Sequence, residues 1–546
     1  MHQTLTNDRI LKRMNPAEYV SIDALSHTFE KRLNSFKQGY RQNLGLIGPK
    51  KIGKSTFLQQ YFIHYPCDDL LVIDFPVYRQ SFPAFVNRYV SNIVETLAKK
   101  EIDTQEKTHE DLLEWVEKKW PKTAEALLAV LSATKKGQLE EAFRHLLNVT
   151  LVLGEELNQR IVIIYEHFDR FDQWDLKDPF ESFGRAIMVQ NQTLFIVTGI
   201  LCEKVTSIFR EKLPLLFGNF EVIEVEGIPF SKAMHWVDTQ LSQFQTVKGV
   251  SSFFVTLCNG SPFYLRRLLN ATKTFCLFHD VTVIDRTIIS EVLNAELKEV
   301  DGYLNQYFQN YMTALIKNRS DAYLYEILLE IVKGNKKPNQ IAAVLGRKLT
   351  EVKKWMNRLL EEGVISKCGK LYYIRDYLFR FWLRYIYSEW HLGRLENERN
   401  LEAIVSSLME SIEDHSRMDL TLRVERLFQL FRNEVVDLGK TRIQCPAFSQ
   451  IVAKPSNGRV FPIVAKSSRS RWLCQVAREK VSEEDIRQFA DNSKKSKEIA
   501  SRRVMISPRG IDLNAKLLAK EEKIAVWGLE DLNQMLDIYD LPKVLV

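Results

Sequence analysis

A glycine-bounded loop near the amino end carries the pattern most directly tied to chemistry. Gly48 to Ser55 has the sequence GPKKIGKS and follows the apolar run Leu44–Ile47, which is G-x-x-x-x-G-K-[ST] between a strand and a helix. The two glycines let the backbone curl so that successive N–H groups point at an anion. We expect Lys54 to reach the β- and γ-phosphates of a nucleotide and Ser55 to offer its hydroxyl to Mg²⁺. The helix beginning near Lys54 directs its positive end at the same phosphates.

A flexible surface loop rich in glycine and lysine is the alternative explanation of this segment. The apolar strand before it and the sequence FLQQYF after it favour a nucleotide-binding loop. The predicted binding set is therefore the loop and the first turn of the helix: Gly48, Pro49, Lys50, Lys51, Ile52, Gly53, Lys54, Ser55 and Thr56.

Such a loop needs an acid at the end of a neighbouring strand to hold Mg²⁺, often followed by a glutamate that activates water. The apolar run Ile161–Tyr165 is followed by Glu166 and His167. If the strand ends at Tyr165, Glu166 takes the metal-side position and His167 stands where the catalytic glutamate belongs. If Tyr165 occupies the metal-side position, Glu166 is the base. We favour the first register because the apolar run includes Tyr165.

In either register the acid pair is incomplete. Loss of a general base lowers a rate by about 10²–10⁴ and leaves binding largely intact, so weak or absent hydrolysis is one expectation. Thr198, near the end of another apolar run, is either a polar sensor of the γ-phosphate or an ordinary strand-end threonine. The segment Gly260-Ser261-Pro262, followed by Tyr264, Arg266 and Arg267, could contact the base or phosphates of a nucleotide, but a helix starting with proline explains these residues equally well.

Buried strands alternating with helices are expected to position these residues. The near-continuous apolar runs Leu70–Tyr78, Ile161–Tyr165 and Thr193–Gly199 are typical of strands buried on both faces. Residues 1–42 form a predicted helical lead-in, and helical patterns fill 81–100 and 109–157 with breaks near Pro121 and Gly137. This alternation predicts a parallel α/β sheet with right-handed crossovers. From about 230 to 315 the pattern is helical, as in a lid.

Residues 320–375 have a different pattern. Helical periods at 321–333, 339–345 and 350–362, the last with Thr350 as its cap, precede two short strands around Gly369. Three helices and a two-stranded wing predict a winged helix–turn–helix. The third helix places four residues on its polar side, which either contact DNA or belong to a packing module: Lys353, Lys354, Asn357 and Arg358.

The last 140 residues resemble a separate α/β domain. The patterns predict a helix at 423–438, strands at 459–465 and 471–477, a helix at 483–492, and a strand at 503–507. The chain has a net charge of +7, whereas the segment from Lys454 to Lys520 holds sixteen Lys/Arg against seven Asp/Glu. This basic surplus could meet phosphate backbones or simply be solvated.

Composition bounds the remaining possibilities. A chain of 546 residues suggests three or four domains. No stretch has the ~18 uninterrupted apolar residues of a membrane helix, and the first fifteen residues lack the apolar region of a secretory signal. The seven cysteines form no C-x-x-C pair. These cysteines predict reduced thiols in a cytoplasmic protein, and neither a metal site nor a catalytic thiol is expected. Because no stretch is apolar enough to cross a membrane, no membrane contact is expected.

With these motifs in order, the chain resembles the archaeal-type ATPases, near the STAND and origin-recognition branch of the AAA+-like P-loop NTPases. The aromatic stretch after the wing matches the family's D-x-x-x-R-F-W at Asp376, Arg380, Phe381 and Trp382. The resemblance implies four domains: an NTPase core at 1–228, a helical lid at 229–315, a winged helix at 316–395 and a nuclease-like domain at 396–546. It also implies that Gly48, Gly53, Lys54 and Ser55 bind Mg-ATP.

The chain departs from this family at several positions. Asn219 stands where relatives often have an arginine that acts in trans, and Arg210 is at best a substitute. In the restriction-endonuclease-like domain, Glu425 matches an early helical glutamate. Three other active-site groups are replaced, because Pro462 stands for the metal-binding Asp, Gln475 for Glu and Ala477 for Lys. The resemblance thus implies a degenerate PD-(D/E)xK-like fold without nuclease chemistry.

Three functions remain open from the sequence. The leading hypothesis is a nucleotide switch that binds ATP and Mg²⁺, hydrolyses ATP weakly or not at all, and is linked to DNA through the winged helix and the basic carboxyl-terminal domain. The first alternative is an active DNA-stimulated ATPase. The second is a non-enzymatic scaffold with a vestigial P-loop, which associates with itself or with a protein partner.

Overall fold

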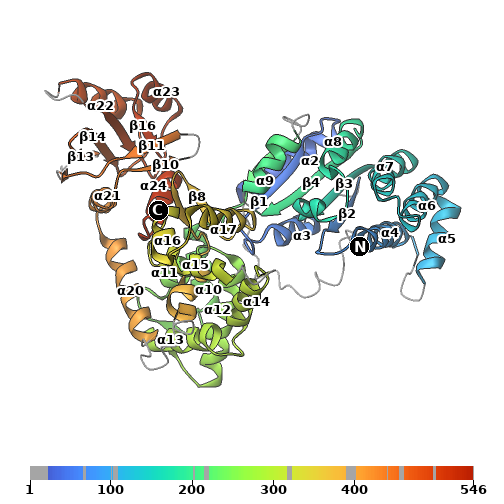
Figure 1. Cartoon of the computed structure of the whole chain (residues 1–546), viewed down its shortest axis with the longest axis horizontal. Coiled ribbons are helices and arrows are strands. Elements are labelled where there is room, and N and C mark those ends of the chain that lie inside the picture. The colour runs from blue at the N-terminus through green and yellow to red at the C-terminus, as the bar shows by residue number, and fades with distance from the viewer. Residues whose placement is uncertain are drawn as a thin grey trace. The chain divides into compact units, whose positions relative to one another are not determined.

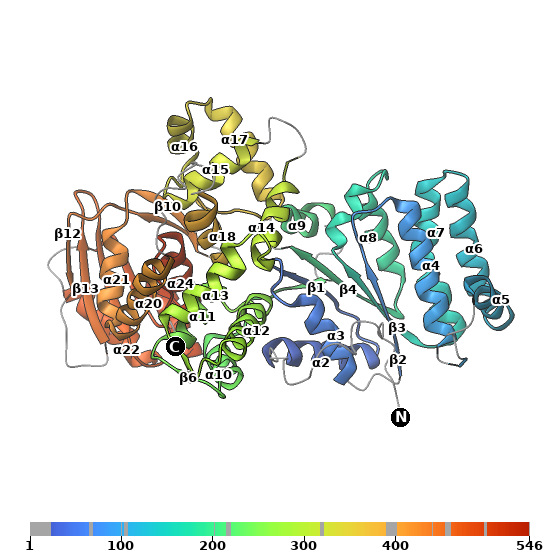
Figure 2. The ribbon, with the colours of Figure 1, turned by 90° about the horizontal axis from the view of Figure 1, so that it is seen from below.

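The computed structural model describes the chain from residue 23 to 544 with several gaps. The described ranges are 23–64, 69–99, 101–102, 108–200, 203–213, 220–316, 322–388, 401–438, 441–453, 460–495 and 500–544. The chain forms two compact units (Figures 1 and 2). Unit 1 comprises Met1–Ile228 with Ser261–Phe263, and unit 2 comprises Pro229–Gly260 with Tyr264–Val546.

Unit 1 is built on a five-stranded sheet with the order β2-β3-β4-β1-β5, in which every pair is parallel. The strands are β1 Asn43–Gly48, β2 Leu70–Pro76, β3 Arg160–Glu166, β4 Thr193–Ile200 and β5 Phe220–Glu224. The chain leaving β1 runs to the β2 edge, whereas the chain leaving β4 crosses β1 to reach β5. The order therefore reverses between β1 and β4, and ligands of open α/β sheets bind outside the carboxyl ends of the strands at such a point.

Helices cover both faces of this sheet (Figure 2). On β3, Val162 and Ile164 pack with α2 and α3, whereas Ile163 and Tyr165 face the opposite core under α4 to α8. This period of two explains why the strand is apolar along its whole length. The helices are α2 Asp23–Lys37, α3 Lys54–His64, α4 Phe82–Ala98, α5 His109–Lys119, α6 Pro121–Lys135, α7 Leu139–Leu157, α8 Pro179–Val189 and α9 Glu203–Ser207.

The predicted elements of unit 1 are confirmed where the sequence pattern is strong. The helical stretch 109–157 divides into three helices, with breaks at Pro121 and near Gly137, whose φ is +73°. Strand β5 was not predicted, because an edge strand buries little of its surface and carries a weak apolar signal. The predicted lead-in lies outside the described residues before Asp23.

The first part of unit 2 is mostly helical, as predicted. Its one strand pair joins the short segments β6 Gln245–Thr246 and β7 Val283–Ile284. The helices are α10 Phe230–Gln240, α11 Val250–Cys258, α12 Pro262–Phe278, α13 Arg286–Leu293 and α14 Tyr303–Thr313. Helix α12 is unusual because the division into units falls within it. Its first two residues, Pro262 and Phe263, belong to unit 1, and its remaining residues belong to unit 2.

Three helices and an antiparallel hairpin follow in the predicted order. They are α15 Tyr323–Val332, α16 Pro338–Leu345, α17 Leu349–Glu361, β8 Ser366–Cys368 and β9 Leu371–Tyr373. The prediction of Thr350 as a helix cap is wrong. Helix α17 begins one residue earlier, so Thr350 lies in its first turn, and the cap position is held by Lys348 without a side-chain bond.

The aromatic stretch after this hairpin connects distant parts of unit 2. It forms α18 (Tyr377–Trp382). Asp376 caps this helix by accepting from the Phe379 N–H at 2.9 Å, and it also accepts from the Tyr264 hydroxyl at 2.5 Å. The Trp382 indole donates to Asn305 at 3.0 Å. Two segments that are remote in sequence therefore meet at one short helix.

The carboxyl-terminal part of unit 2 is a second α/β layer, with the sheet order β12-β13-β14-β15-β16. The first three strands are antiparallel neighbours, and the last two pairs are parallel. The elements are α20 Leu401–Arg417, α21 Leu420–Gln429, β10 Glu434–Leu438, β11 Thr441–Cys445, β12 Gln450–Ala453, β13 Val460–Lys466, β14 Arg471–Ala477, α22 Glu483–Lys495, β15 Arg502–Ile506, α23 Leu513–Glu521, β16 Ala525–Trp527 and α24 Leu529–Ile538. No helix in the described ranges is long and apolar enough to cross a membrane.

The predicted helix at 423–438 is wrong in its second half. The helix ends at Gln429, and Glu434–Leu438 forms β10 instead. Asn433 adopts the left-handed φ of +61° that turns the chain. Val436 and Leu438 are buried on one face while Asp437 is exposed, which is the alternation of a strand.

The β8–β9 hairpin packs against β10. Gly369 at its turn has a φ of +62°, and a Cβ added there would lie 1.7 Å from the Val435 carbonyl oxygen. The next amide, Lys370 N–H, donates to the same carbonyl at 3.1 Å. Only glycine permits this approach of two backbones.

We predict that Gly369→Ala destabilises unit 2 far more than Gly346→Ala. Both glycines have a φ of +62°, but nothing lies within 4 Å of a Cβ at Gly346. Strain alone costs about 1–2 kcal/mol, and the clash at Gly369 adds roughly 1–3 kcal/mol. Thermal unfolding and limited proteolysis of the two variants measure the difference. Equal losses of stability would contradict the packing of the hairpin on β10.

Candidate functional site

The loop between β1 and α3 is shaped by its two glycines. A Cβ at Gly48 would lie 2.5 Å from the carbonyl oxygen of Val225, and Gly53 has a φ of +98°. Lys51 also adopts a left-handed φ of +61°. Alternating hands of this kind turn consecutive amides to one side and form an anion-binding concavity. The loop is therefore a folded element at the carboxyl edge of the sheet.

Lys54 folds back over this loop. Its ammonium donates to the carbonyl oxygens of Gly48 and Pro49, each at 2.8 Å. An ammonium has three N–H donors, so one remains beyond these two bonds. Burial lowers the pKa of Lys54 to about 8, an effect opposed by the charges of Asp169 and Glu166. The side chain thus presents a desolvated cation at the mouth of the loop.

Ser55 and Glu166 meet across the sheet edge. The Ser55 hydroxyl donates to Glu166 Oε2 at 2.9 Å, and Glu166 is 8% exposed. Tyr165 is 1% exposed and packs with Phe75 and Phe195 in the opposite core. The structure therefore places Glu166, and not Tyr165, beside the loop serine.

His167 and Thr198 form the next turn. His167 has a left-handed φ of +58°, and its backbone N–H donates to the Thr198 hydroxyl at 3.1 Å. Burial lowers the pKa of His167 to about 4, and the charges of Arg170 and Lys54 add to this effect. The imidazole is therefore neutral at pH 7 and a poor proton acceptor.

Two acids near the loop, Asp74 and Asp169, were given no role in the predictions from the sequence. Burial, with the charge of Glu166, raises the pKa of Asp74 on β2 well above its usual range. The Asp74 Oδ1 atom is buried and makes no hydrogen bond. Asp169 is the strongest of the nearby charges that raise the pKa of Lys54. The signal for Asp74 was present, because it is an acid inside the apolar run LLVIDFP, near the end of the strand beside β3.

Metal binding by the protein alone is not supported in the described ranges, which hold no group of three or more His, Cys, Asp and Glu side chains able to share a metal. Mg²⁺ in nucleotide sites needs less, because one or two protein oxygens act together with phosphates and waters. The Ser55 hydroxyl and the Glu166 carboxylate are oxygen donors of this kind.

Residues Ser261–Phe263 complete the surroundings of the loop within unit 1. The Ser261 hydroxyl donates to the Lys51 carbonyl at 3.0 Å, and the Lys51 ammonium lies 4.8 Å from the centre of the Phe263 ring. Two residues farther along α12 are used elsewhere, because Tyr264 binds Asp376 and the Arg267 Nε donates to Glu296 at 2.8 Å.

The proposed finger residues have no established role here. Arg210 is exposed and paired with the adjacent Glu211 at 2.6 Å. Asn219 lies outside the described residues.

The polar side of α17 is partly occupied. Lys353, Lys354 and Asn357 are exposed, and Val352 and Met356 are buried on the opposite side of the helix. Arg358 donates to the Leu315 carbonyl at 2.5 Å, so this guanidinium helps to hold the preceding segment.

The nuclease-like positions lie together but lack the required chemistry. Pro462 on β13 is directly opposite Gln475 on β14, and Ala477 is buried two residues farther along. Glu425 lies on α21. Five basic residues of this domain form ion pairs with acids: Arg478 with Asp419, Lys480 with Asp512, Arg487 with Glu483, Lys494 with Glu522 and Arg509 with Glu479.

Comparison with known proteins finds distant structural likenesses. The Walker-type ATPase PABY2304 of Pyrococcus abyssi is 14% identical with a TM-score of 0.46, over 68% of this chain and 97% of that chain. The ORC2 protein of Aeropyrum pernix, in ADPNP–ADP complexes, is 11% identical with a TM-score of 0.41, over 73% and 98%. The RuvB Holliday junction branch migration motor of Thermotoga maritima is 12% identical with a TM-score of 0.32, over 70% and 98%.

No family model and no curated protein matches the sequence. The structural likenesses are too distant to carry an argument about function. The strand order, the loop geometry and the Ser55–Glu166 pair define unit 1 as an α/β fold with a P-loop.

We predict that polyphosphate binding at this loop weakens as the pH rises. Lys54 has a pKa of about 8 without ligand, so it is mostly charged at pH 7 and mostly neutral at pH 9. A bound polyanion favours the charged form, and the affinity for ATP should fall roughly ten-fold between pH 7 and pH 9. Titration calorimetry at constant ionic strength measures it. An affinity that is flat over this range would contradict the assignment.

Proposed function

We propose that the chain is an ATP-binding switch with weak hydrolysis. The observation that carries this proposal is the joint geometry of Lys54, folded over the glycine-bounded loop, and Ser55, bonded to Glu166 at 2.9 Å. Both lie at the carboxyl edge of a parallel sheet beside its topological switch point, where nucleotides bind. Adenine is chosen over guanine on the family resemblance.

The loop residues Gly48 to Thr56 would hold the phosphates. Backbone amides and the remaining Lys54 N–H are donors, which match the acceptor oxygens of a triphosphate. Ser55 and Glu166 would hold Mg²⁺, which neutralises part of the phosphate charge when bound. A buried carboxylate whose pKa is raised by burial becomes ionised more readily beside a cation.

Weak hydrolysis follows from the residue after Glu166. His167 has a pKa of about 4 because it is buried among cations, so it accepts a proton poorly from an attacking water. Thr198 accepts a hydrogen bond from His167 and keeps its own hydroxyl hydrogen for donation. We propose that Thr198 contacts the γ-phosphate and orients it without supplying a base.

An active ATPase is the second candidate, and one observation favours it. Asp74 is a carboxylate with a raised pKa and an unpartnered, buried Oδ1 on the strand next to β3. A general base needs a raised pKa and a position at the reacting edge. Asp74 therefore offers a base from a neighbouring strand in place of His167.

The switch would be transmitted along α12. Ser261 and Phe263 contact Lys51 of the loop, and the same helix continues to Tyr264, which binds Asp376 in unit 2. A ligand shifts a conformational equilibrium only through its differential contacts with the two states. We propose that phosphate binding alters the hydrogen bond from the Ser261 hydroxyl to the Lys51 carbonyl. This bond would then differ between the ligand-free and the ligand-bound state.

The output would pass through α15–β9, which we propose to be a winged helix. Its third helix α17 exposes Lys353, Lys354 and Asn357, which are suited to phosphate and base contacts. Arg358 has a structural bond to Leu315 and is left out of this role. The carboxyl-terminal layer is proposed to be a nuclease-like fold without cleavage chemistry, because Pro462 and Ala477 supply neither an acid nor an amine.

We predict that Lys54→Ala weakens ATP binding by about ten-fold or more without unfolding the protein. Loss of the charged donor removes a charge-assisted bond worth about 1.5–3 kcal/mol, and the buried site loses its cation. Equilibrium titration with fluorescent ATP measures binding, and wild-type affinity in the variant would refute the site. Absence of saturable binding in the wild type would favour the scaffold with a vestigial P-loop.

Phosphate release by the same samples separates the two candidates. The switch predicts slow turnover that is insensitive to Asp74→Asn. Turnover that duplex DNA stimulates and that Asp74→Asn removes would favour the active ATPase. Asp69→Asn is the matched control, since Asp69 is an exposed acid one residue before β2 and is paired with Lys37.

We predict that Lys353→Glu with Lys354→Glu weakens duplex binding, and that Lys135→Glu with Lys136→Glu does not. Both pairs are adjacent, exposed lysines, but the control pair ends α6 in unit 1. Each lost phosphate contact should reduce the slope of log affinity against log salt by about 0.9. Fluorescence anisotropy over a salt series measures this slope, and equal effects of the two pairs would exclude α17 as the contact.

A further inference from the structure

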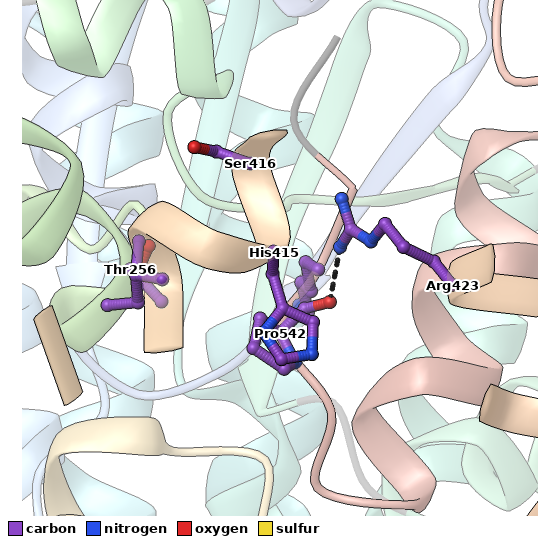
Figure 3. Close-up of a pocket in the computed structure, with 7 residues that line it drawn as sticks. Thr256, His415, Ser416, Arg423 and Pro542 are labelled. Atoms are coloured by element: carbon purple, nitrogen blue, oxygen red, sulfur yellow. Dashed lines mark hydrogen bonds between the residues drawn. The ribbon is translucent and has the colours of Figure 1, made fainter. Parts of the chain in front are cut away.

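A cavity in unit 2 is lined by cations from segments that are distant in sequence. Its volume is about 50 Å³, and α11, α20, α21 and the chain after α24 contribute side chains to it (Figure 3). Thr256, His415, Arg423 and Lys543 line it. None of the described lining residues is acidic.

Arg423 is the unusual member of this group. The side chain lies on α21 and the residue is only 6% exposed. One N–H donates to the Pro542 carbonyl at 2.6 Å, whereas the buried Nε has no hydrogen-bond partner. Asp419, one turn earlier, pairs with Arg478. Among the described residues no carboxylate forms an ion pair with this buried guanidinium, an arrangement that is costly unless an anion is supplied.

The other walls of the cavity are also donors. The Thr256 hydroxyl oxygen is buried and makes no hydrogen bond. Lys543 donates to Asn259 at 2.9 Å with one of its three N–H groups. His415 bonds the Ser411 carbonyl through Nδ1 at 2.7 Å, and this residue also lines the cavity (Figure 3). Arg423, Lys543 and the unpartnered hydroxyl of Thr256 therefore line the same cavity.

The size of the cavity restricts the ligand. A water needs about 10–15 Å³ of such volume, so about 50 Å³ holds a group of roughly four or five heavy atoms. A tetrahedral oxyanion fits this limit, whereas a nucleoside or a peptide does not. The Pro542 carbonyl is an acceptor, and it matches the hydroxyl of a protonated phosphate.

We propose that this cavity binds free inorganic phosphate, held by Arg423, Lys543 and Thr256. The ion satisfies the buried charge of Arg423 and the unpartnered Thr256 hydroxyl. It also joins α11 to α21 and to the chain around Pro542, so phosphate ties the carboxyl-terminal layer to the helical part of unit 2. This site is separate from the P-loop of unit 1.

The test uses the full chain with Lys54→Ala, so that the P-loop does not bind the probe. Inorganic phosphate is titrated by calorimetry and by thermal shift, with sodium chloride holding the ionic strength constant. We expect saturable binding and a rise in Tm. Arg423→Met should weaken phosphate binding by about ten-fold or more, since a charge-assisted bond is lost. Arg426→Met, which removes an exposed arginine of the same helix, should leave the affinity unchanged.

Each contrary result is informative. An equal rise in Tm with chloride alone, or unchanged phosphate affinity in Arg423→Met, overturns the proposal. Saturable binding of adenosine monophosphate at the cavity without binding of phosphate assigns the site to a phosphate ester and overturns the choice of free phosphate. If Arg423→Met fails to fold, Lys543→Gln decides, since it must weaken phosphate binding while Arg426→Met does not.

Discussion

A hydrogen bond between Ser55, in the first turn of α3, and Glu166, at the end of β3, organises the candidate site. The sheet of unit 1 is parallel throughout, so the carboxyl ends of β1 and β3 reach the same edge, where the Ser55 hydroxyl meets the Glu166 carboxylate. This bond requires a tight turn after Gly48, where a side chain would strike the Val225 carbonyl. It also requires Tyr165 to face the opposite core. The placement of Lys54, His167 and Asp74 follows from the same sheet edge.

A second constraint organises unit 2. Asp376 and Arg380 lie one turn apart at the start of α18. Asp376 accepts a hydrogen bond from the hydroxyl of Tyr264 in the helical region. Arg380 forms ion pairs with Asp537 and Asp540 at the end of α24. The conspicuous aromatic motif of the sequence is therefore a structural joint. Its charged residues bind neighbouring layers, and its aromatic residues fill the core between them.

The sequence was sufficient to predict elements whose signal is local, and to predict contacts between residues that the topology of a parallel sheet brings to one edge. The glycine-bounded loop, the strands β1 to β4 and the Ser55–Glu166 contact belong to this class, because the rules of parallel sheets specify the shared edge. The helix predicted at 423–438 failed because the apolar residues of β10 also fit a helical period. The cavity at Arg423 was beyond reach, since Thr256 and Lys543 are brought to it only by tertiary packing. Asp74 was missed because its apolar surroundings concealed an acid at a functional edge.

The hairpin β8–β9 has a consequence for how unit 2 could accommodate a duplex. Gly369 and Lys370 at its tip are held against the backbone of Val435, with no room for even one methyl group. In the form described, β10 therefore covers the backbone of this tip. Insertion of the tip into a groove of another molecule would first require β10 to move away from the hairpin.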